Sequence, residues 1–261
     1  MGSDMGVVIV TGFSRGTCPD SYEAPVLLSI SNAGLTRGTT PVFDGLTLQL
    51  HEPRIGLIGD NGAGKSSLFR MACGLEAPHT GTVTVQGLPA LRINARRPNL
   101  VGMMFQNPDD QIVFPTVQEE LALGLTATGM PRRDAIAQAR VFLASRGLEA
   151  WAERAISSLS QGQRQHVCWL AILLSQPALI LMDEPFASLD LPGQALLHDD
   201  MARAPQHIIV STHVLEHLRG FDRVIWLEQG RVRADGPADA VCAAYRADVV
   251  ARIANRTAAP R

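Results

Sequence analysis

Eight consecutive residues have the types and spacing of a loop that holds phosphate. Gly59-Asp-Asn-Gly-Ala-Gly-Lys-Ser66 fits the pattern G-x-x-x-x-G-K-[ST], and it lies between an expected strand, Arg54–Ile58, and an expected helix over residues 66–74. Glycines let backbone N–H groups curl around phosphate oxygens, and the start of a helix attracts the same anion. The alternative, a glycine-rich turn with a chance Lys-Ser pair, is disfavoured by this context. The residues expected to contact phosphate are Gly59, Asn61, Gly62, Ala63, Gly64, Lys65, Ser66 and Ser67.

Lys65 is the only lysine of the chain, which otherwise uses arginine wherever a cation is needed. A lysine side chain ends in a compact charge that can reach the β- and γ-phosphates of a nucleotide from inside a closed loop, whereas the planar fork of arginine is bulkier. The neighbouring Ser66 hydroxyl is a candidate ligand for Mg²⁺. The loop therefore predicts binding of a nucleoside triphosphate together with Mg²⁺.

Two adjacent carboxylates follow the apolar run Leu179–Met182, which is expected to be a buried strand. In open α/β folds ligands bind at the carboxyl edge of a parallel sheet, so Asp183 is placed to support the metal ion. Glu184 can polarise the attacking water as a general base, or hold it in position. An Asp-Glu pair after a strand is usually only a solvated turn, but the phosphate loop upstream favours a catalytic role in nucleotide hydrolysis.

Residues 159–163, Leu-Ser-Gln-Gly-Gln, open another expected helix. Ser160 and the free N–H groups of the first helical turn could hold a second anion, although an ordinary serine N-cap is the alternative. The segment resembles the LSGGQ signature of ABC ATPases, with Gln161 in place of the first glycine, where a side chain could alter the approach of phosphate. The resemblance implies that Ser160, Gly162 and Gln163 cap the γ-phosphate of ATP bound to a partner chain, so that two chains sandwich two nucleotides.

The resemblance extends over residues 26–240, and further motifs occur in the order of the family. Gln106 resembles the Q-loop glutamine, which implies contact with Mg²⁺, although on its own it could be a surface amide. His213 resembles the switch histidine, which implies a catalytic contact with the γ-phosphate, although a single histidine after a strand is often structural. Ser188-Leu-Asp190 resembles the D-loop that crosses the dimer interface.

The segment upstream of the phosphate loop departs from the family, which usually supplies an aromatic ring to stack on adenine. Leu35-Thr-Arg-Gly38 contains neither tyrosine nor phenylalanine. Arg37 could stack on the base of ATP through its guanidinium plane, or it could be a solvated turn cation. We therefore expect weak selectivity for the base.

Phe105-Gln-Asn-Pro-Asp-Asp-Gln-Ile112, followed by Val117-Gln-Glu-Glu-Leu121, is similar to the Q-loop region of ATPases in energy-coupling factor (ECF) transporters, although Asp109 and Asp110 could be turn formers. The resemblance implies an ATPase homodimer, or a heterodimer with a related ATPase. It also implies a transmembrane coupling protein and a substrate-binding membrane protein as partners at the cytoplasmic face of the cell membrane. The implied cargo is a vitamin, with biotin favoured, or a transition-metal ion such as cobalt or nickel.

A soluble ABC ATPase that acts on ribosomes or DNA is the competing hypothesis. Ribosomal members usually carry two ATPase domains with a charged linker, and DNA-repair members place a long coiled coil between the phosphate loop and the signature. The sequence shows neither feature. The transport hypothesis is therefore favoured.

The patterns around these motifs predict an α/β fold, and the resemblance to ABC ATPases implies that its core is a mixed RecA-like sheet. From Arg54 on, short apolar segments alternate with helical patterns, which implies parallel strands joined by crossovers. Val26–Ile30 and Leu46–Leu50 are expected to form an antiparallel β subdomain, and residues 107–177 a helical subdomain interrupted at Pro131. The expected divisions are an N-terminal extension at 1–25 that could partly come from cloning, an ABC ATPase domain at 26–240, and a C-terminal Ala-rich helix with an Arg-containing tail at 241–261.

Composition limits the partners and the compartment. The net charge of −2 gives no global basic field of the kind that drives non-specific nucleic-acid binding, so no nucleic-acid partner is expected. The four cysteines show no C-x-x-C spacing and predict reduced thiols in a cytosolic protein. No apolar run approaches the roughly 20 residues of a spanning helix. Any work at a membrane is therefore expected to be that of a peripheral subunit.

Overall fold

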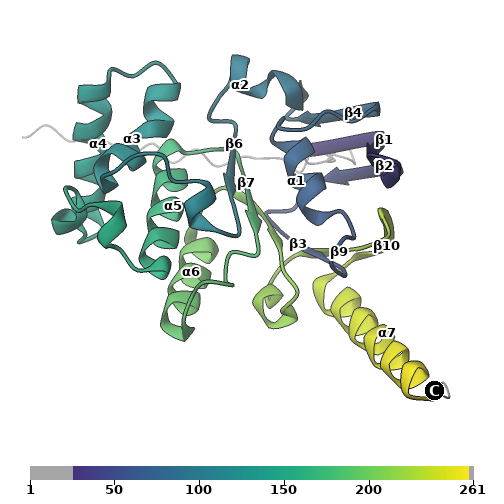
Figure 1. Ribbon diagram of the computed structural model, residues 1–261. Coiled ribbons are helices and arrows are strands. Elements are labelled where there is room, and N and C mark those ends of the chain that lie inside the picture. Colours follow the sequence, from purple (N-terminus) through teal and green to yellow (C-terminus); the bar gives the residue numbers. More distant parts are fainter. Residues whose placement is uncertain (1–25, 259–261) are drawn as a thin grey trace, which may run out of the picture.

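The computed structural model describes residues 26–258. The extension expected at residues 1–25 and the last residues of the tail, 259–261, lie outside this range. A central sheet runs through the middle of the molecule, with a smaller antiparallel sheet on one side and a group of helices on the other (Figure 1). The predicted α/β class is therefore confirmed.

The central sheet has six strands in the order β10-β9-β3-β8-β7-β6. All neighbouring strands pair in parallel except β10, which pairs antiparallel with β9. The parallel strands are nearly continuous apolar runs because both faces of the sheet are covered. The carboxyl ends of β3, β7 and β8 therefore meet at one edge. The bounds are β3 Arg54–Ile58, β6 Val101–Met104, β7 Leu179–Asp183, β8 His207–Ser211, β9 Arg223–Glu228 and β10 Arg231–Gly236.

The second sheet has the order β2-β1-β4-β5, and all of its pairs are antiparallel. Its long hairpin, β1–β2, overlaps both expected strands but extends well beyond them, and its outer half still buries Ala33, Leu35 and Phe43. Helix α1, Lys65–Ala72, shares one core with both sheets, in which Phe69 packs with Ile30 and Leu57. The bounds are β1 Leu28–Arg37, β2 Thr40–Leu50, β4 Thr80–Val85 and β5 Leu88–Pro89.

Three helices form the group at the other end of the sheet: α3 (Val117–Ala127), α4 (Arg132–Ser145) and α5 (Gln161–Ser175). They bury their own apolar core, and α5 also contributes Trp169 to the core below the central sheet. Pro131 is the N-cap of α4, which confirms the predicted interruption. The helix that carries the signature segment is thus anchored in both layers.

The remaining elements include features that the sequence patterns did not predict. A 3₁₀ turn, Leu215–Leu218, follows β8. Strand β10, strand β5 and the short helix α2, Ile93–Arg96, were not predicted. Helix α6 spans Leu191–Arg203, and α7, Ala238–Ala258, projects away from the body (Figure 1).

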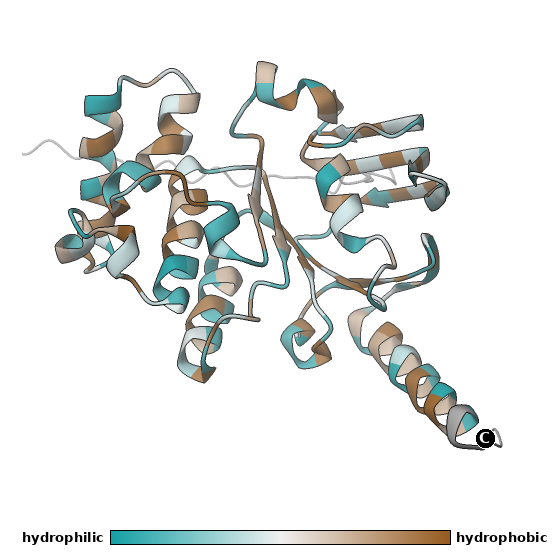
Figure 2. Cartoon of the chain, in the orientation of Figure 1, coloured by the Kyte–Doolittle hydropathy of each residue, from teal (hydrophilic) through white to brown (hydrophobic). Residues whose placement is uncertain are grey.

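Apolar residues gather along the central strands, whereas α7 is mixed in character (Figure 2). Only the first turns of α7 join the core, through Ala238 and Val241. Within residues 26–258, no helix has the length and apolar character needed to cross a bilayer. Cys73 and Cys168 are buried free thiols and Cys242 is a half-buried one, in line with the predicted reduced state.

Candidate nucleotide-binding site

The loop between β3 and α1 presents backbone N–H groups. Helix α1 begins after Gly64, which has a left-handed backbone (φ 105°), and no side chain caps the helix. A Cβ at Gly64 would lie 2.7 Å from the ring of Phe43, and a Cβ at Gly59 would lie 2.1 Å from the carbonyl oxygen of Leu227. The loop therefore needs glycine at both positions. The N–H groups of the first helical turn stay available for an anion.

Lys65 closes this loop from inside. Its Nζ donates hydrogen bonds to the carbonyl oxygens of Gly59 at 2.7 Å and Asp60 at 3.2 Å, and its side chain is almost fully buried. Burial lowers the pKa of Lys65, while the carboxylates of Glu184, Asp183 and Asp60 act in the opposite direction. A compact ammonium group fits between these carbonyls and carboxylates, where a planar guanidinium would not.

A cleft of about 740 Å³ opens over the loop and brings together residues from distant parts of the chain. Among the predicted loop residues only Ala63 does not line it, because Ala63 is buried in the hydrophobic core behind the loop. The predicted residues that line the cleft are Arg37, Gly59, Asn61, Gly62, Gly64, Lys65, Ser66, Ser67, Gln106, Asp183, Glu184 and His213.

Groups from β8 and the following loop hold the two carboxylates. Asp183 Oδ1 accepts a hydrogen bond from Ser211 Oγ at 2.5 Å, and the two residues are direct neighbours in the parallel register. Glu184 Oε2 lies 2.9 Å from His213 Nδ1, so the two residues predicted to be catalytic are in contact. Glu184 also has a left-handed backbone (φ 48°), a strain that clusters at functional sites. Ser211 was not predicted, although its place two residues before His213 could have indicated it.

The donors expected to hold a metal ion fit magnesium. Ser66, Gln106 and Asp183 line the same cleft and offer a hydroxyl, an amide and a carboxylate oxygen. Mg²⁺ prefers oxygen ligands and usually takes one or two carboxylates together with phosphate oxygens. Over residues 26–258, no three His, Cys, Asp or Glu side chains gather into a metal cage. The donor set therefore suits an ion that the nucleotide phosphates help to hold.

The signature segment lies in a different cleft of about 440 Å³, so the structure does not bring it to the phosphate loop of the same chain. Ser160 is the N-cap of α5, which was the alternative to an anion-binding role. Its Oγ accepts from the N–H of Gln163 at 3.2 Å, and Gln163 Oε1 accepts from the N–H of Ser160 at 3.1 Å. Gln161 Nε2 donates to Ser188 Oγ of the D-loop segment at 3.1 Å. Gly162 lies between these residues in the first turn.

The Q-loop segment is tied to the same helix. Residues Pro108–Asp110 form a 3₁₀ turn, which agrees with the turn-forming interpretation. Asp109 also forms an ion pair at 2.8 Å with Arg164 of α5. Glu120, which is buried, accepts hydrogen bonds from the backbone N–H groups of residues 113 and 114. Glu120 is a positioning residue for this segment that the sequence analysis did not single out.

Residues outside the phosphate loop and the carboxyl edge of the central sheet also line the cleft, and one of them, Arg37, was predicted. Arg37 lies at the end of β1, where its guanidinium pairs with Glu76 at 3.1 Å, and its proposed stacking on the base stays a prediction. Tyr245 reaches the cleft from α7, and its spacing in the sequence gave no signal. The further lining residues are Thr40, Val42 and Asp60.

Comparison with known proteins decides the family. A family model described as ABC transporter matches residues 43–187. The biotin transport ATP-binding protein BioM of Rhodobacter capsulatus is 45% identical over 218 residues, covering 84% of this chain and 93% of that protein. The chain belongs to the ABC transporter family.

Two further similarities concern an ECF ATPase and the fold. The energy-coupling factor transporter ATP-binding protein EcfA of Methanoculleus marisnigri is 34% identical over 212 residues, covering 78% of this chain and 76% of that protein. Among solved structures, cbiO1 from Clostridium perfringens, described as part of the ABC transporter complex cbiONQ, superposes with a TM-score of 0.70 at 24% identity. That superposition covers 84% of this chain and 91% of cbiO1.

The family resemblance stated from the motifs is thereby confirmed. As an ABC ATPase, the chain binds and hydrolyses ATP and couples hydrolysis to transport. These relatives are transport proteins, which favours transport over work on ribosomes or DNA.

Proposed function

We propose that this ABC ATPase powers biotin uptake as the ATP-hydrolysing subunit of an ECF-type importer. The observation that carries the proposal is the 45% identity to a biotin transport ATP-binding protein over nearly all of that protein's length. The cleft at the carboxyl edge of the sheet supports it, because a phosphate loop, two carboxylates and a histidine converge there. Uptake of a transition-metal ion, the other cargo that the sequence resemblance to ECF ATPases implies, is the second candidate.

Within the cleft, the free N–H groups at the start of α1 bind the ATP phosphates, and Lys65 neutralises the β- and γ-phosphates. Ser66, Gln106 and Asp183 would hold Mg²⁺, which supplies charge neutralisation at the phosphate oxygens. Ser67 and Asn61 complete the wall of the cleft around the phosphates.

Hydrolysis depends on the contact between Glu184 and His213. The carboxylate of Glu184 can orient a water molecule and accept its proton, and the 2.9 Å contact with His213 Nδ1 fixes the direction of that carboxylate. His213 is largely exposed at the mouth of the cleft, where its free ring nitrogen can reach the γ-phosphate. The two residues thus divide water positioning and phosphate sensing between them.

A second ATPase chain completes each site. Ser160, Gly162 and Gln163 line a cleft that shares no residue with the phosphate cleft of the same chain. They can cap a γ-phosphate only if a second copy, or a related ATPase, presents them. We propose such a homodimer or heterodimer at the cytoplasmic face of the membrane. Its partners are a transmembrane coupling protein and a substrate-binding membrane protein.

The first experiment replaces Glu184 with Gln, which keeps the shape of the side chain but removes the general base. ATP should still bind, a closed dimer should accumulate with MgATP in size-exclusion chromatography, and kcat should fall by at least about 100-fold. Hydrolysis at the wild-type rate would refute the role of Glu184.

The second experiment tests the cargo and the class. The chain is isolated from native membranes, its partners are identified, and uptake of labelled biotin into vesicles is compared between wild type and Glu184→Gln. ATP-dependent biotin uptake that Glu184→Gln abolishes is the expected result. Uptake of cobalt or nickel instead of biotin would overturn the cargo, and extraction with RNA or ribosomes but never with membrane proteins would overturn the transport function.

A further inference from the structure

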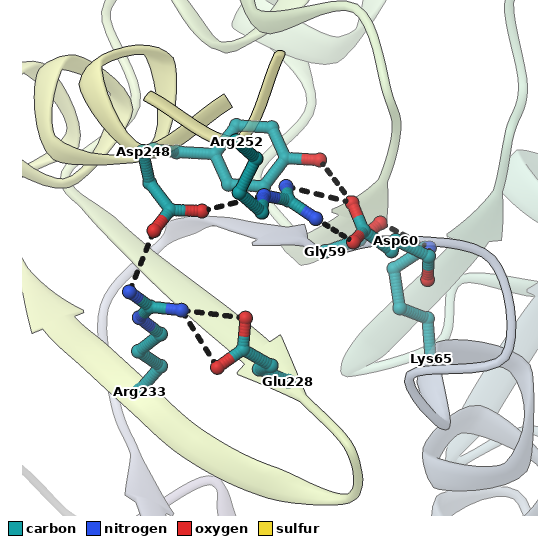
Figure 3. Close-up of polar contacts among 8 residues, drawn as sticks. Gly59, Asp60, Lys65, Glu228, Arg233, Asp248 and Arg252 are labelled. Atoms are coloured by element: carbon teal, nitrogen blue, oxygen red, sulfur yellow. Dashed lines mark hydrogen bonds and ion pairs between the residues drawn. The ribbon is translucent and has the colours of Figure 1, made fainter. Parts of the chain in front are cut away.

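The C-terminal helix α7 contacts the phosphate loop directly. Tyr245 Oη donates to Asp60 Oδ1 at 3.0 Å, and the guanidinium of Arg252 holds both carboxylate oxygens of Asp60, with Nη1 2.5 Å from Oδ2 and Nη2 3.3 Å from Oδ1. Figure 3 shows the side chains of Arg252 and Asp60 meeting beside Gly59 and Lys65. Asp60 and Tyr245 also line the nucleotide cleft. A helix near the end of the chain therefore contacts the proposed ATP site through its side chains.

Arg252 is itself held in place by a line of alternating charges. Its Nε lies 2.8 Å from Asp248, which also pairs with Arg233 of β10 at 2.6 Å, and Arg233 pairs with Glu228 at the end of β9 at 2.6 Å (Figure 3). Tyr245 adds an edge-on contact with Trp226 of β9, with ring centroids 5.1 Å apart. The central sheet thus fixes the direction from which Arg252 approaches the loop.

Asp60 presents an electrostatic problem for an ATP site. The cleft already contains Asp183 and Glu184, and Lys65 is the only cation inside its loop. A further carboxylate beside bound phosphates repels them. The hydrogen bond from Arg252 lowers the pKa of Asp60, so Asp60 stays ionised and its charge must be offset by a partner rather than by protonation.

We propose that Arg252 is a positioning residue of the ATP site. It neutralises and orients Asp60, so that the phosphate loop accepts a polyanion, and it thereby makes ATP affinity depend on the docking of α7. This inference rests on the proposed ATPase function and adds a residue from outside the motifs of the phosphate loop. Displacement of α7 would expose the carboxylate to the phosphates and so lower ATP affinity.

The test measures ATP binding and hydrolysis on the full-length chain. Arg252→Ala should weaken ATP binding about fivefold at low salt, with less effect at high salt because exposed charges are screened. It should raise KM and leave kcat at saturating ATP nearly unchanged, and Arg252→Lys should recover most of the affinity. Arg246→Ala is the matched control, because Arg246 lies on the same helix but pairs with Glu216 outside the cleft. It should bind ATP as wild type does.

A double-mutant cycle separates electrostatics from folding. Once Asp60→Asn removes the carboxylate, the further change Arg252→Ala should no longer weaken ATP binding. A double variant that loses as much affinity as Arg252→Ala alone would show that the contact is merely structural and would overturn the inference. The same conclusion follows if Arg252→Ala binds like wild type while Lys65→Ala does not. If the wild-type chain shows no saturable ATP binding, the proposed function itself fails.

Discussion

Two helix N-termini of this protein carry the motifs for phosphate, and they are built in opposite ways. Helix α1 begins at Gly64 without any side-chain cap, whereas α5 begins with a complete capping box between Ser160 and Gln163. The first leaves its N–H groups open to a ligand, and the second satisfies two of its own N–H groups within the chain. An ATP phosphate would therefore supply the hydrogen-bond acceptors that the first N–H groups of α1 lack. At α5 it would compete with, or add to, the hydrogen bonds of the capping box.

The difference indicates an order of events. The phosphate loop can bind ATP in a single chain, because its donors are free and Lys65 is already in place. The signature helix satisfies its first N–H groups within the chain, so in the proposed dimer its contribution would come when a second chain brings it to the γ-phosphate. Binding and dimer closure should therefore be separable by substitutions at the two helix starts, and three predictions test this.

The largest effect is expected at Lys65. Lys65→Ala should weaken ATP binding about 100-fold, since charge-assisted hydrogen bonds to phosphate contribute about 1.5–3 kcal/mol each. Lys65→Arg should recover only part of this, because the guanidinium is too bulky for the closed loop. Ser160→Ala should bind ATP with nearly wild-type affinity. Calorimetric titration of ATP into each variant measures these affinities. Equal losses for Lys65→Ala and Ser160→Ala would abolish the distinction between the two helix starts.

A smaller effect separates two glycines. Gly64→Ala forces a left-handed alanine against Phe43 and should lower both ATP affinity and the free energy of unfolding, the latter by about 1–3 kcal/mol. Gly162→Ala lies in a regular helical turn, where the new Cβ would be 3.6 Å from Leu189, an ordinary contact. This variant should be as stable as wild type or up to about 1 kcal/mol more stable. If the phosphate accepts a hydrogen bond from the first turn of α5, the added methyl group should keep it away. Hydrolysis by the dimer should then fall about tenfold, the value of one such hydrogen bond.

Thermal melts report the stability of each variant, and turnover measured as a function of protein concentration reports its dimer-dependent hydrolysis. A Gly162→Ala variant with full turnover would show that phosphate does not approach this turn, which would contradict the proposed role of the signature segment in the dimer.

The smallest effect is expected at Gln161. Its side chain donates a hydrogen bond to Ser188 of the same chain, so it is held away from the position of an incoming phosphate. Gln161→Gly should change turnover by less than about threefold, roughly the value of one exposed hydrogen bond. Steady-state hydrolysis measures it, with Ser188→Ala as the matched control for loss of the contact alone. A tenfold gain in Gln161→Gly would instead mean that the side chain obstructs closure.

The motifs with contiguous residues were predictable, and the contacts between distant segments were not. The phosphate loop and the Asp183-Glu184 pair could be assigned because strand, turn and helix follow one another in the sequence. Their convergence followed from the rule that parallel strands place their carboxyl ends at one edge. The contact between Glu184 and His213 is a consequence of the neighbouring positions of β7 and β8.

Other features gave no sequence signal. Strand β10 is half exposed, so its alternating arginines read as a polar loop. Arg252 belongs to a helix that looks like a solvated, Ala-rich surface element, and Asp60 is separated from it by 192 positions. Whether such an arginine is solvated or paired depends on where the helix packs, and local sequence does not determine that. An ordinary serine N-cap was the alternative at Ser160, and the structure shows a full capping box in which the Gln163 side chain also takes part.

The single lysine has a practical consequence. An amine-reactive ester can acylate this chain only at Lys65 and at the N-terminal amine. Because the Lys65 amine is buried and bonded to two carbonyl oxygens, its labelling requires the loop to open, and a nucleotide lying over it adds a further shield. The rate at which the peptide containing Lys65 is labelled, followed by mass spectrometry, would then report how often the loop opens within an assembled membrane complex.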